Sequence, residues 1–253
     1  MKSSLAIHIR VIYALILREA RVRHGRSRLG YTWAIMEPFL LIAFLTLIFS
    51  TYRQTSREDF VIFFATGVLS FQLFIRISQY VAGSFLANKS LLNYPRVKQI
   101  DTIIARFILD YLTHLLVMVL AFTFLVNVLR AQPPHNIGGC LLWTFVIASF
   151  ALGAGLCLAE FRKLMPIIDT IYRIILGPAF FVSGIFYSLN DVPSQFKSLL
   201  VWNPLIHCVE GFRSAYFAGY RAPDISMEYV LVWTLVLLFI GMMAEGTIKR
   251  AVE

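Results

Sequence analysis

Long apolar runs recur along this chain of 253 residues and restrict what it can fold into. A run of about 20 apolar residues is long enough to cross the hydrocarbon core of a bilayer. Such a run must be helical, because a helix satisfies its own backbone hydrogen bonds in lipid. We predict six spans, located approximately at residues 32–51, 60–80, 104–128, 139–158, 167–187 and 228–245.

Composition and charge set the class of protein and its orientation. The hydrophobic fraction is 58%, so we predict an all-α polytopic membrane protein with one transmembrane domain over residues 1–253. The net charge of +9 could suggest nucleic-acid binding. However, Lys and Arg collect in cytosolic loops, and placing both termini in the cytosol puts most of them inside. We therefore expect cytosolic termini and no nucleic-acid partner.

Within the N-terminal segment 1–30, which we expect to be cytosolic or interfacial, residues 5–24 are too charged to span but have an amphipathic pattern. On a helical wheel Leu5, Ile9, Ile12 and Ile16 share one face, and the opposite face carries Arg10, Arg18 and Arg21. This pattern is typical of a helix that lies in the membrane interface with its basic side near anionic headgroups. A plain basic topology signal is the alternative interpretation.

A second irregular segment, residues 190–223, lies between the fifth and sixth spans, on the outer side of the membrane. It is moderately apolar, and Pro193 and Pro204 divide it into pieces too short to cross a bilayer. We predict short re-entrant helices that dip into the outer leaflet, with an amphipathic surface loop as the alternative. Trp143 and Trp202 are expected at the membrane interface.

Sequence motifs for catalysis are missing from the chain. There is no Gly-x-x-x-x-Gly-Lys-Ser/Thr phosphate loop, no His-Glu-x-x-His and no Gly-x-Ser-x-Gly. His207, Cys208 and Glu210 lie close together, but only His207 and Glu210 share a helix face. We therefore expect these residues to be structural, and we expect neither a metal site nor an enzyme.

Several ionisable residues fall inside or at the ends of the predicted spans. Such groups cost at least about 2.5–3.5 kcal/mol near the bilayer centre, so they usually face protein or water. Glu37 precedes Pro38, and Arg76 has no obvious carboxylate nearby in the sequence. Spacings of four residues could bring together two pairs, Asp110 with His114 and Asp169 with Arg173. The pattern leaves both structural pairing and a polar substrate path open.

Three segments carry a family resemblance. They are Leu-Arg-Glu-Ala-Arg-Val-Arg-His-Gly-Arg-Ser-Arg-Leu-Gly-Tyr-Thr-Trp-Ala-Ile-Met-Glu-Pro at 17–38, Leu-Leu-Asn-Tyr-Pro-Arg-Val-Lys-Gln-Ile-Asp-Thr-Ile-Ile-Ala-Arg at 91–106, and Trp-Asn-Pro-Leu-Ile-His-Cys-Val-Glu-Gly-Phe-Arg-Ser-Ala-Tyr-Phe-Ala-Gly-Tyr at 202–220. Together they resemble the permease subunit of ABC-2-type exporters, in the capsular-polysaccharide (KpsM-like) branch. Gln99 departs from the pattern, because a proline is expected before Ile-Asp.

The resemblance implies an assembly. Two copies of this chain would form the pathway, and two copies of a separate ATPase would bind ATP and Mg below it. This chain would bind no cofactor itself. The cytosolic loop 87–102 would dock on the ATPase through the following residues: Leu92, Tyr94, Arg96, Lys98 and Asp101. A solvated cytosolic loop is the plainer interpretation.

The resemblance also implies a cargo, a lipid-linked acidic polysaccharide moved from cytosol to periplasm across the bacterial inner membrane. Periplasmic co-polymerase and outer-membrane export proteins would carry the chain onward. The expected substrate path comprises Arg10, Arg18, Arg21, Arg26, Arg28, Tyr31, Trp33, Glu37 and Arg76. The expected periplasmic exit comprises Trp202, His207, Glu210, Arg213 and Tyr216. The alternatives are export of O-antigen, a teichoic-acid-like polymer or a small molecule, and a membrane-embedded glycosyl or prenyl transferase.

Overall fold

The computed structural model describes residues 2–25, 28–50, 57–91, 94, 97–165 and 167–252. Side chains are described for residues 6, 8–22, 36–48, 60–91, 94, 97–165 and 167–247. Every regular element within these ranges is a helix, as the apolar runs predict. The helices that correspond to the six predicted spans are α2 (Arg28–Ser50), α3 (Arg57–Ala82), α5 (Gln99–Val128), α6 (Ile137–Leu164), α7 (Ile168–Val182) and α10 (Met227–Val252).

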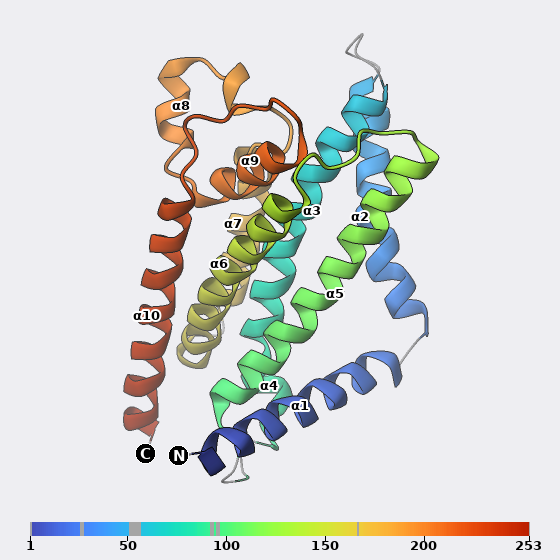
Figure 1. The fold of residues 1–253 in the computed structure, drawn as a ribbon. Coiled ribbons are helices and arrows are strands. Elements are labelled where there is room, and N and C mark those ends of the chain that lie inside the picture. Colours follow the sequence, from blue (N-terminus) through green and yellow to red (C-terminus); the bar gives the residue numbers. More distant parts are fainter. Residues whose placement is uncertain are drawn as a thin grey trace.

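Shorter elements connect or flank these helices. They are α1 (Lys2–Gly25), α4 (Ser84–Asn88), the 3-10 turn η1 (Leu189–Asp191), α8 (Ser194–Leu200) and α9 (Pro204–Tyr216). In Figure 1, α1 lies across one end of the bundle, and the C-terminal end of α10 lies at the same end. Helices α8 and α9 lie at the opposite end. Below, these are called the α1 end and the α9 end.

One of the predicted spans is shorter than expected. Among the described residues, α3, α5, α6 and α10 are long and apolar enough to cross a membrane, and the described side chains of α2 include the apolar stretch Met36–Ile48. The predicted span 167–187 is wrong at its outer end, because α7 has only 15 residues and stops at Val182. The chain then turns at Gly184, whose φ of +77° lies in the left-handed region that glycine tolerates.

Helix α3 forms the centre of the molecule and packs against α2, α5, α6 and α9. It is apolar on nearly all sides, as expected for a fully buried helix, and Phe64, Leu73 and Ile77 are almost completely enclosed. Helix α10 covers the far side of α6. By contrast, α7 makes few contacts within the chain and leaves a largely apolar face exposed, including Ile174 and Phe181.

The two short helices predicted between Pro193 and residue 223 are present as α8 and α9. Asn203 caps α9 by accepting a hydrogen bond from the Leu205 N–H at 3.0 Å. Trp143, which was expected at the membrane interface, has its ring buried against Gly211 of α9. A Cβ atom at Gly211 would come within 2.4 Å of that ring, so only glycine allows α9 and α6 to approach this closely.

Candidate functional site

A buried polar network joins four helices at the α1 end. The Glu19 carboxylate of α1 accepts hydrogen bonds from Arg106 Nε at 3.0 Å, Tyr80 Oη at 2.9 Å and Asn88 Nδ2 at 3.2 Å. Arg106 also donates to the Tyr80 carbonyl at 2.9 Å and lies over the Tyr80 ring. Burial alone would raise the pKa of Glu19, but the Arg106 charge and the three donors outweigh it and lower that pKa. Glu19 is therefore ionised and fixes α1 to α3, α4 and α5.

A second contact joins α1 to the end of the loop 87–102. His8 Nδ1 lies 3.0 Å from the Asp101 carboxylate, which also accepts a hydrogen bond from the Lys98 N–H at 3.0 Å. The hydrogen bond from the Lys98 N–H to Asp101 caps the first turn of α5. Because Asp101 is only 2% exposed, the structure places it as a brace for the loop end, not on the surface where it was expected to dock.

The other residues expected to dock fall into two groups. Tyr94 is 63% exposed, and Lys98 is also exposed, so both are accessible to a partner. Leu92 and Arg96 lie outside the described residues. The loop is held at both ends, because Arg18 of α1 donates a hydrogen bond to Asn88 Oδ1 at 2.7 Å. This contact turns Arg18 away from the exposed basic side on which it was expected.

Helix α1 has a side that is buried against the bundle, an exposed apolar side and an exposed basic side. Leu15 and Glu19 are buried against the bundle, Ile9 and Tyr13 are exposed, and Arg10 is exposed beside them. Arg21 is also exposed. The side chains of Arg26, Arg28, Tyr31 and Trp33, which were expected in the substrate path, lie outside the described residues.

The charges within the helices pair differently from what spacing predicts. Arg76 of α3 forms an ion pair with Glu37 of α2, and both side chains keep more than a third of their surface exposed. The predicted contact of His114 with Asp110 is confirmed, at 3.7 Å. The predicted pairing of Asp169 with Arg173 is wrong: Asp169 pairs with Arg162, which lies on the last turn of α6. Arg173 is exposed on α7.

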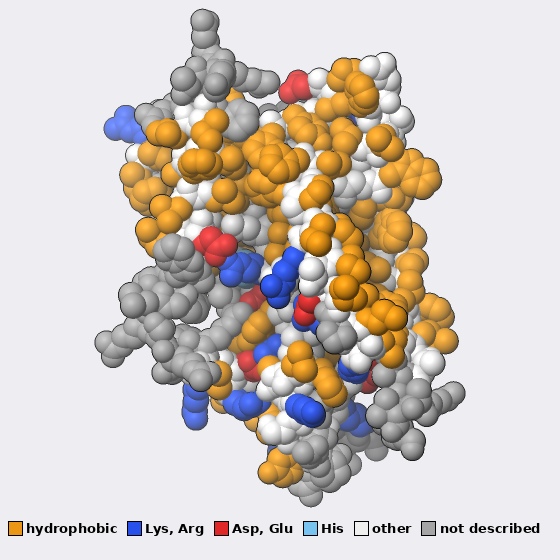
Figure 2. All heavy atoms as spheres, turned by 180° about the vertical axis from the view of Figure 1, so that it is seen from behind, with side chains coloured by type: hydrophobic (Ala, Val, Ile, Leu, Met, Phe, Trp, Pro, Cys, Tyr) orange, Lys and Arg blue, Asp and Glu red, His pale blue; other side chains and the backbone are white. Residues whose placement is uncertain are grey.

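Arg76 and Arg173 lie at similar depth on neighbouring helices. Helices α3 and α7 run antiparallel, since Ser78 Oγ contacts Tyr172 Oη at 2.7 Å while Phe71 packs on Phe180 with ring centroids 5.3 Å apart. This register places Arg76 opposite the turn of α7 that carries Arg173. In Figure 2 the charged side chains of this face gather in the half nearer α1, and hydrophobic side chains predominate toward the α9 end.

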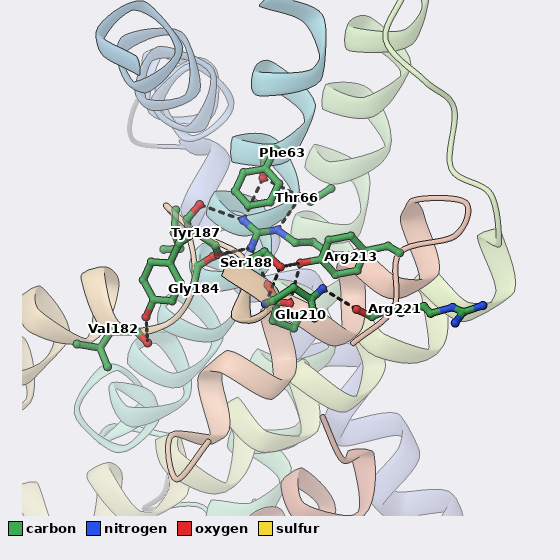
Figure 3. Close-up of polar contacts among 12 residues, drawn as sticks. Phe63, Thr66, Val182, Gly184, Tyr187, Ser188, Glu210, Arg213 and Arg221 are labelled. Atoms are coloured by element: carbon green, nitrogen blue, oxygen red, sulfur yellow. Dashed lines mark hydrogen bonds and ion pairs between the residues drawn. The ribbon is translucent and has the colours of Figure 1, made fainter. Parts of the chain in front are cut away.

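At the α9 end, Glu210 and Arg213 form an ion pair at 3.0 Å with no exposed side-chain surface (Figure 3). Arg213 donates to the carbonyl oxygens of Phe63, Gly184, Ile185 and Tyr187 and lies over the Phe63 ring. Glu210 accepts a hydrogen bond from Tyr220 Oη at 2.7 Å. The pair thus joins α9 to α3 and to the irregular backbone that follows α7.

The five residues expected to line an exit differ in how exposed their side chains are. Glu210, Arg213, Tyr216 and His207 are all buried, and Tyr216 donates a hydrogen bond to the Gln132 carbonyl at 2.8 Å. Within this protomer these four cannot contact a passing polymer and instead hold α9 in place. Only Trp202 is accessible, with 77% of its surface exposed.

Comparison with known proteins identifies the family. The family model described as "ABC-2 type transporter" matches residues 10–217, a region that includes α1 from residue 10 onward and all of α9. The chain belongs to the ABC-2 type transporter family. It is therefore the membrane component of a transporter and a multi-pass membrane protein. The Glu19 network and the Glu210–Arg213 ion pair lie inside the matched region, whereas Tyr220, which donates to Glu210, lies just beyond it.

Individual relatives of this ABC-2 protein cover nearly the whole chain. The "Polysialic acid transport protein KpsM" of Escherichia coli is 36% identical over 95% of this chain and 94% of its own length. The "Capsule polysaccharide export inner-membrane protein BexB" of Haemophilus influenzae is 30% identical over 100% and 96%. The "O-antigen export system permease protein RfbA" of Klebsiella pneumoniae is 19% identical over 98% and 96%.

Gln99 shows how this ABC-2 protein uses the position at which a proline was expected. The Gln99 side chain donates to the buried Glu160 carboxylate and accepts a hydrogen bond from Lys163 Nζ at 3.0 Å. It therefore joins the first turn of α5 to the last turns of α6. Proline is compatible with the first position of a helix, but it could not make either of these bonds.

We expect Gln99→Ala to lower the free energy of unfolding by about 1–3 kcal/mol, because Glu160 loses a donor in a fully buried place. Gln99→Pro should behave similarly, since the helix start tolerates proline but the side-chain bonds are lost. Thermal unfolding of the purified chain in detergent measures the effect. The exposed Gln195→Ala is the matched control. Equal melting temperatures for all variants would contradict this role.

Proposed function

We propose that this chain is the transmembrane subunit of an exporter that moves a lipid-linked acidic capsular polysaccharide from the cytosol to the periplasm. The observation that carries the proposal is full-length similarity to relatives named for polysialic acid transport and capsule polysaccharide export. The relative named for O-antigen export is only 19% identical, so a capsular cargo is favoured over O-antigen.

The proposed topology has six spans in the bacterial inner membrane, with both termini in the cytosol. The position of α1 and of the end of α10 at one end of the bundle supports it. Helix α1 would lie in the inner interface, with Ile9 and Tyr13 toward lipid and Arg10 near headgroups. Helices α8 and α9 would lie in or near the outer leaflet as short re-entrant elements.

The proposed assembly contains two copies of this chain and two copies of a separate ATPase, which would bind ATP and Mg. Support for a second copy comes from α7, whose exposed face carries Arg173 among apolar residues. A charged group at membrane depth usually faces protein or a water-filled space, so this face suits an interface around a polar path. The exposed Tyr94 and Lys98 suit docking of the ATPase. Periplasmic co-polymerase and outer-membrane proteins would receive the polymer.

The charges on this face favour an acidic cargo. Arg173 has no carboxylate within ion-pair distance among the described residues, while Arg76 is partly neutralised by Glu37. A positive charge in a space of reduced dielectric attracts anionic groups more strongly than it would in bulk water. Arg10 and Arg21 on α1 would similarly attract the polymer to the cytosolic surface.

We therefore expect Arg173→Glu to reduce polymer export at least tenfold and Arg173→Gln to reduce it less, because the first change repels an anionic chain and the second only removes the attraction. The measurement is cell-surface polysaccharide in a strain whose chromosomal copy is deleted, at matched membrane levels of each variant. Arg221→Glu, an exposed site at the α9 end, is the control for charge change alone.

Two outcomes would contradict the proposed anionic path along α7 or the proposed export function. Wild-type export by Arg173→Glu would remove the anionic path along α7. Normal surface polysaccharide in the deletion strain would remove the export function itself.

A further inference from the structure

A cavity of about 660 Å³ lies at the α9 end, on the side of α8 and the start of α10, and charged and hydroxyl side chains contribute to its mainly apolar lining. Its size falls in the range of small-molecule sites. The indole of Trp202 is exposed at this cavity, and at 77% it is the most exposed of the large hydrophobic side chains in the described ranges. The indole of Trp202 is therefore not held by packing within the protomer and is free to contact a ligand in the cavity.

The floor of the cavity holds the Trp202 backbone rigidly. His207 Nε2 donates to the Val201 carbonyl at 2.7 Å, and its Nδ1 accepts from the Ser226 N–H at 3.0 Å. Burial lowers the pKa of His207, in agreement with this neutral ring. Tyr229 packs on the ring, with centroids 4.9 Å apart, and its hydroxyl donates to the Trp202 carbonyl at 2.8 Å. The exposed indole is therefore attached to a fixed turn, which reduces the entropy lost on binding a ligand.

The walls of the cavity offer both donors and acceptors. Lys197 of α8 and Asp224 of the loop before α10 form an ion pair at 2.7 Å, and both keep part of their surface exposed. Ser194 and Ser198 lie four residues apart on α8 and also line the cavity. Charged and hydroxyl groups thus line the same cavity as the exposed indole.

We propose that this cavity binds a pyranose unit of the exported polysaccharide as it leaves the membrane, an inference that rests on the proposed function. The apolar face of a sugar ring packs on the indole, while its hydroxyl groups donate to Asp224 and accept from Lys197 and the serines. A carboxylate on the sugar binds Lys197. An acyl chain has no hydrogen-bonding groups to offer Lys197, Asp224 or the serines, so a saccharide fits this lining better than a lipid tail.

The test uses the full chain in lipid nanodiscs and a fluorescently labelled tetramer of sialic acid as the probe. We expect saturable binding that Trp202→Ala weakens at least fivefold and Trp202→Tyr weakens less, because tyrosine retains an aromatic face. Lys197→Met and Asp224→Asn are each expected to weaken binding at least threefold. Leu199→Ala is the matched control, since Leu199 is 73% exposed on α8 but does not line the cavity. Gel filtration checks that each variant is folded.

Three results would overturn the proposal. They are no binding by the wild type, equal binding by the wild type and Trp202→Ala, and quenching by brominated lipids, without any effect of the tetramer, of the part of the tryptophan fluorescence that Trp202→Ala removes. The last result would make Trp202 a membrane-interface residue. These failures leave export by the wild type intact. Conversely, tetramer binding that depends on Trp202, together with a normal capsule in the deletion strain, would retain the site and reject the export function.

Discussion

Replacing Arg213 with methionine is expected to prevent this chain from accumulating as a folded protein. The substitution leaves the Glu210 carboxylate buried without its cation and removes the donor from four backbone carbonyls. Breaking a buried ion pair from one side typically costs about 3–5 kcal/mol, which is a large fraction of the stability of most proteins. Fluorescence-detected gel filtration after a temperature ramp measures the loss.

The controls separate the buried pair from a general effect of removing an arginine. Arg221→Met changes an exposed arginine at the same end and should leave the melting temperature within a few degrees of the wild type. Glu210→Gln combined with Arg213→Met should recover part of the loss, because no uncompensated charge remains. If Arg213→Met unfolded at the wild-type temperature, the central role of this pair would be refuted.

Replacing Arg106 with methionine is expected to release α1 from the bundle and to abolish export. Glu19 would keep only the Tyr80 and Asn88 donors and would lose the charge that balances it. The free energy that holds α1 should fall by about 3–5 kcal/mol, as for other buried pairs broken from one side. Hydrogen exchange of α1 amides, measured by mass spectrometry in nanodiscs, reports this release directly.

The matched control for Arg106→Met is Val22→Ala, which changes an exposed residue of α1. It should leave exchange in α1 unchanged. Protection of α1 that is equal in Arg106→Met and in the wild type would show that the contacts of Leu15 and its neighbours hold the helix without the Glu19 network.

The same network predicts a dependence on pH. The pKa of Glu19 is lower in the folded protein than its ordinary value of 4.5. The stabilisation that ionised Glu19 provides is therefore complete above about pH 4.5. It is lost as the pH falls through the lowered pKa that Glu19 has in the folded protein. Amides of α1 should exchange faster at low pH, after correction for the intrinsic rate, and Glu19→Gln should remove this change. A change of equal size in Glu19→Gln would assign it to another group.

The positions of the helices could be predicted from the sequence, because hydropathy and length determine spans in lipid. The partners of charged residues could not, since helical spacing describes contacts only within one helix. Arg76 forms an ion pair with Glu37, which lies on another helix and 39 positions earlier in the sequence. Asp169 lies in the first turn of α7 and contacts Arg162 across the break after Leu164, where spacing on a single helix has no meaning.

The site residues show the same limit. The pairing of Glu210 with Arg213 is visible in the sequence, as they lie three positions apart on α9. The burial of Glu210 and Arg213 is not visible in the sequence, because it depends on Phe63 and on the turn at Gly184, which are distant in the sequence. Residues that appeared suited to an exit consequently serve to hold α9. Asp101 is similar, since only the folded chain brings His8 to it.

In the proposed six-span topology, the shortness of α7 would affect the surrounding bilayer. Its 15 residues extend about 22 Å, whereas the hydrocarbon core of a typical membrane is about 30 Å thick. Hydrophobic mismatch of this kind is relieved by local thinning of the bilayer. A lipid-anchored chain that moved along α7 would cross about a quarter less hydrocarbon than one that moved along α5 or α6.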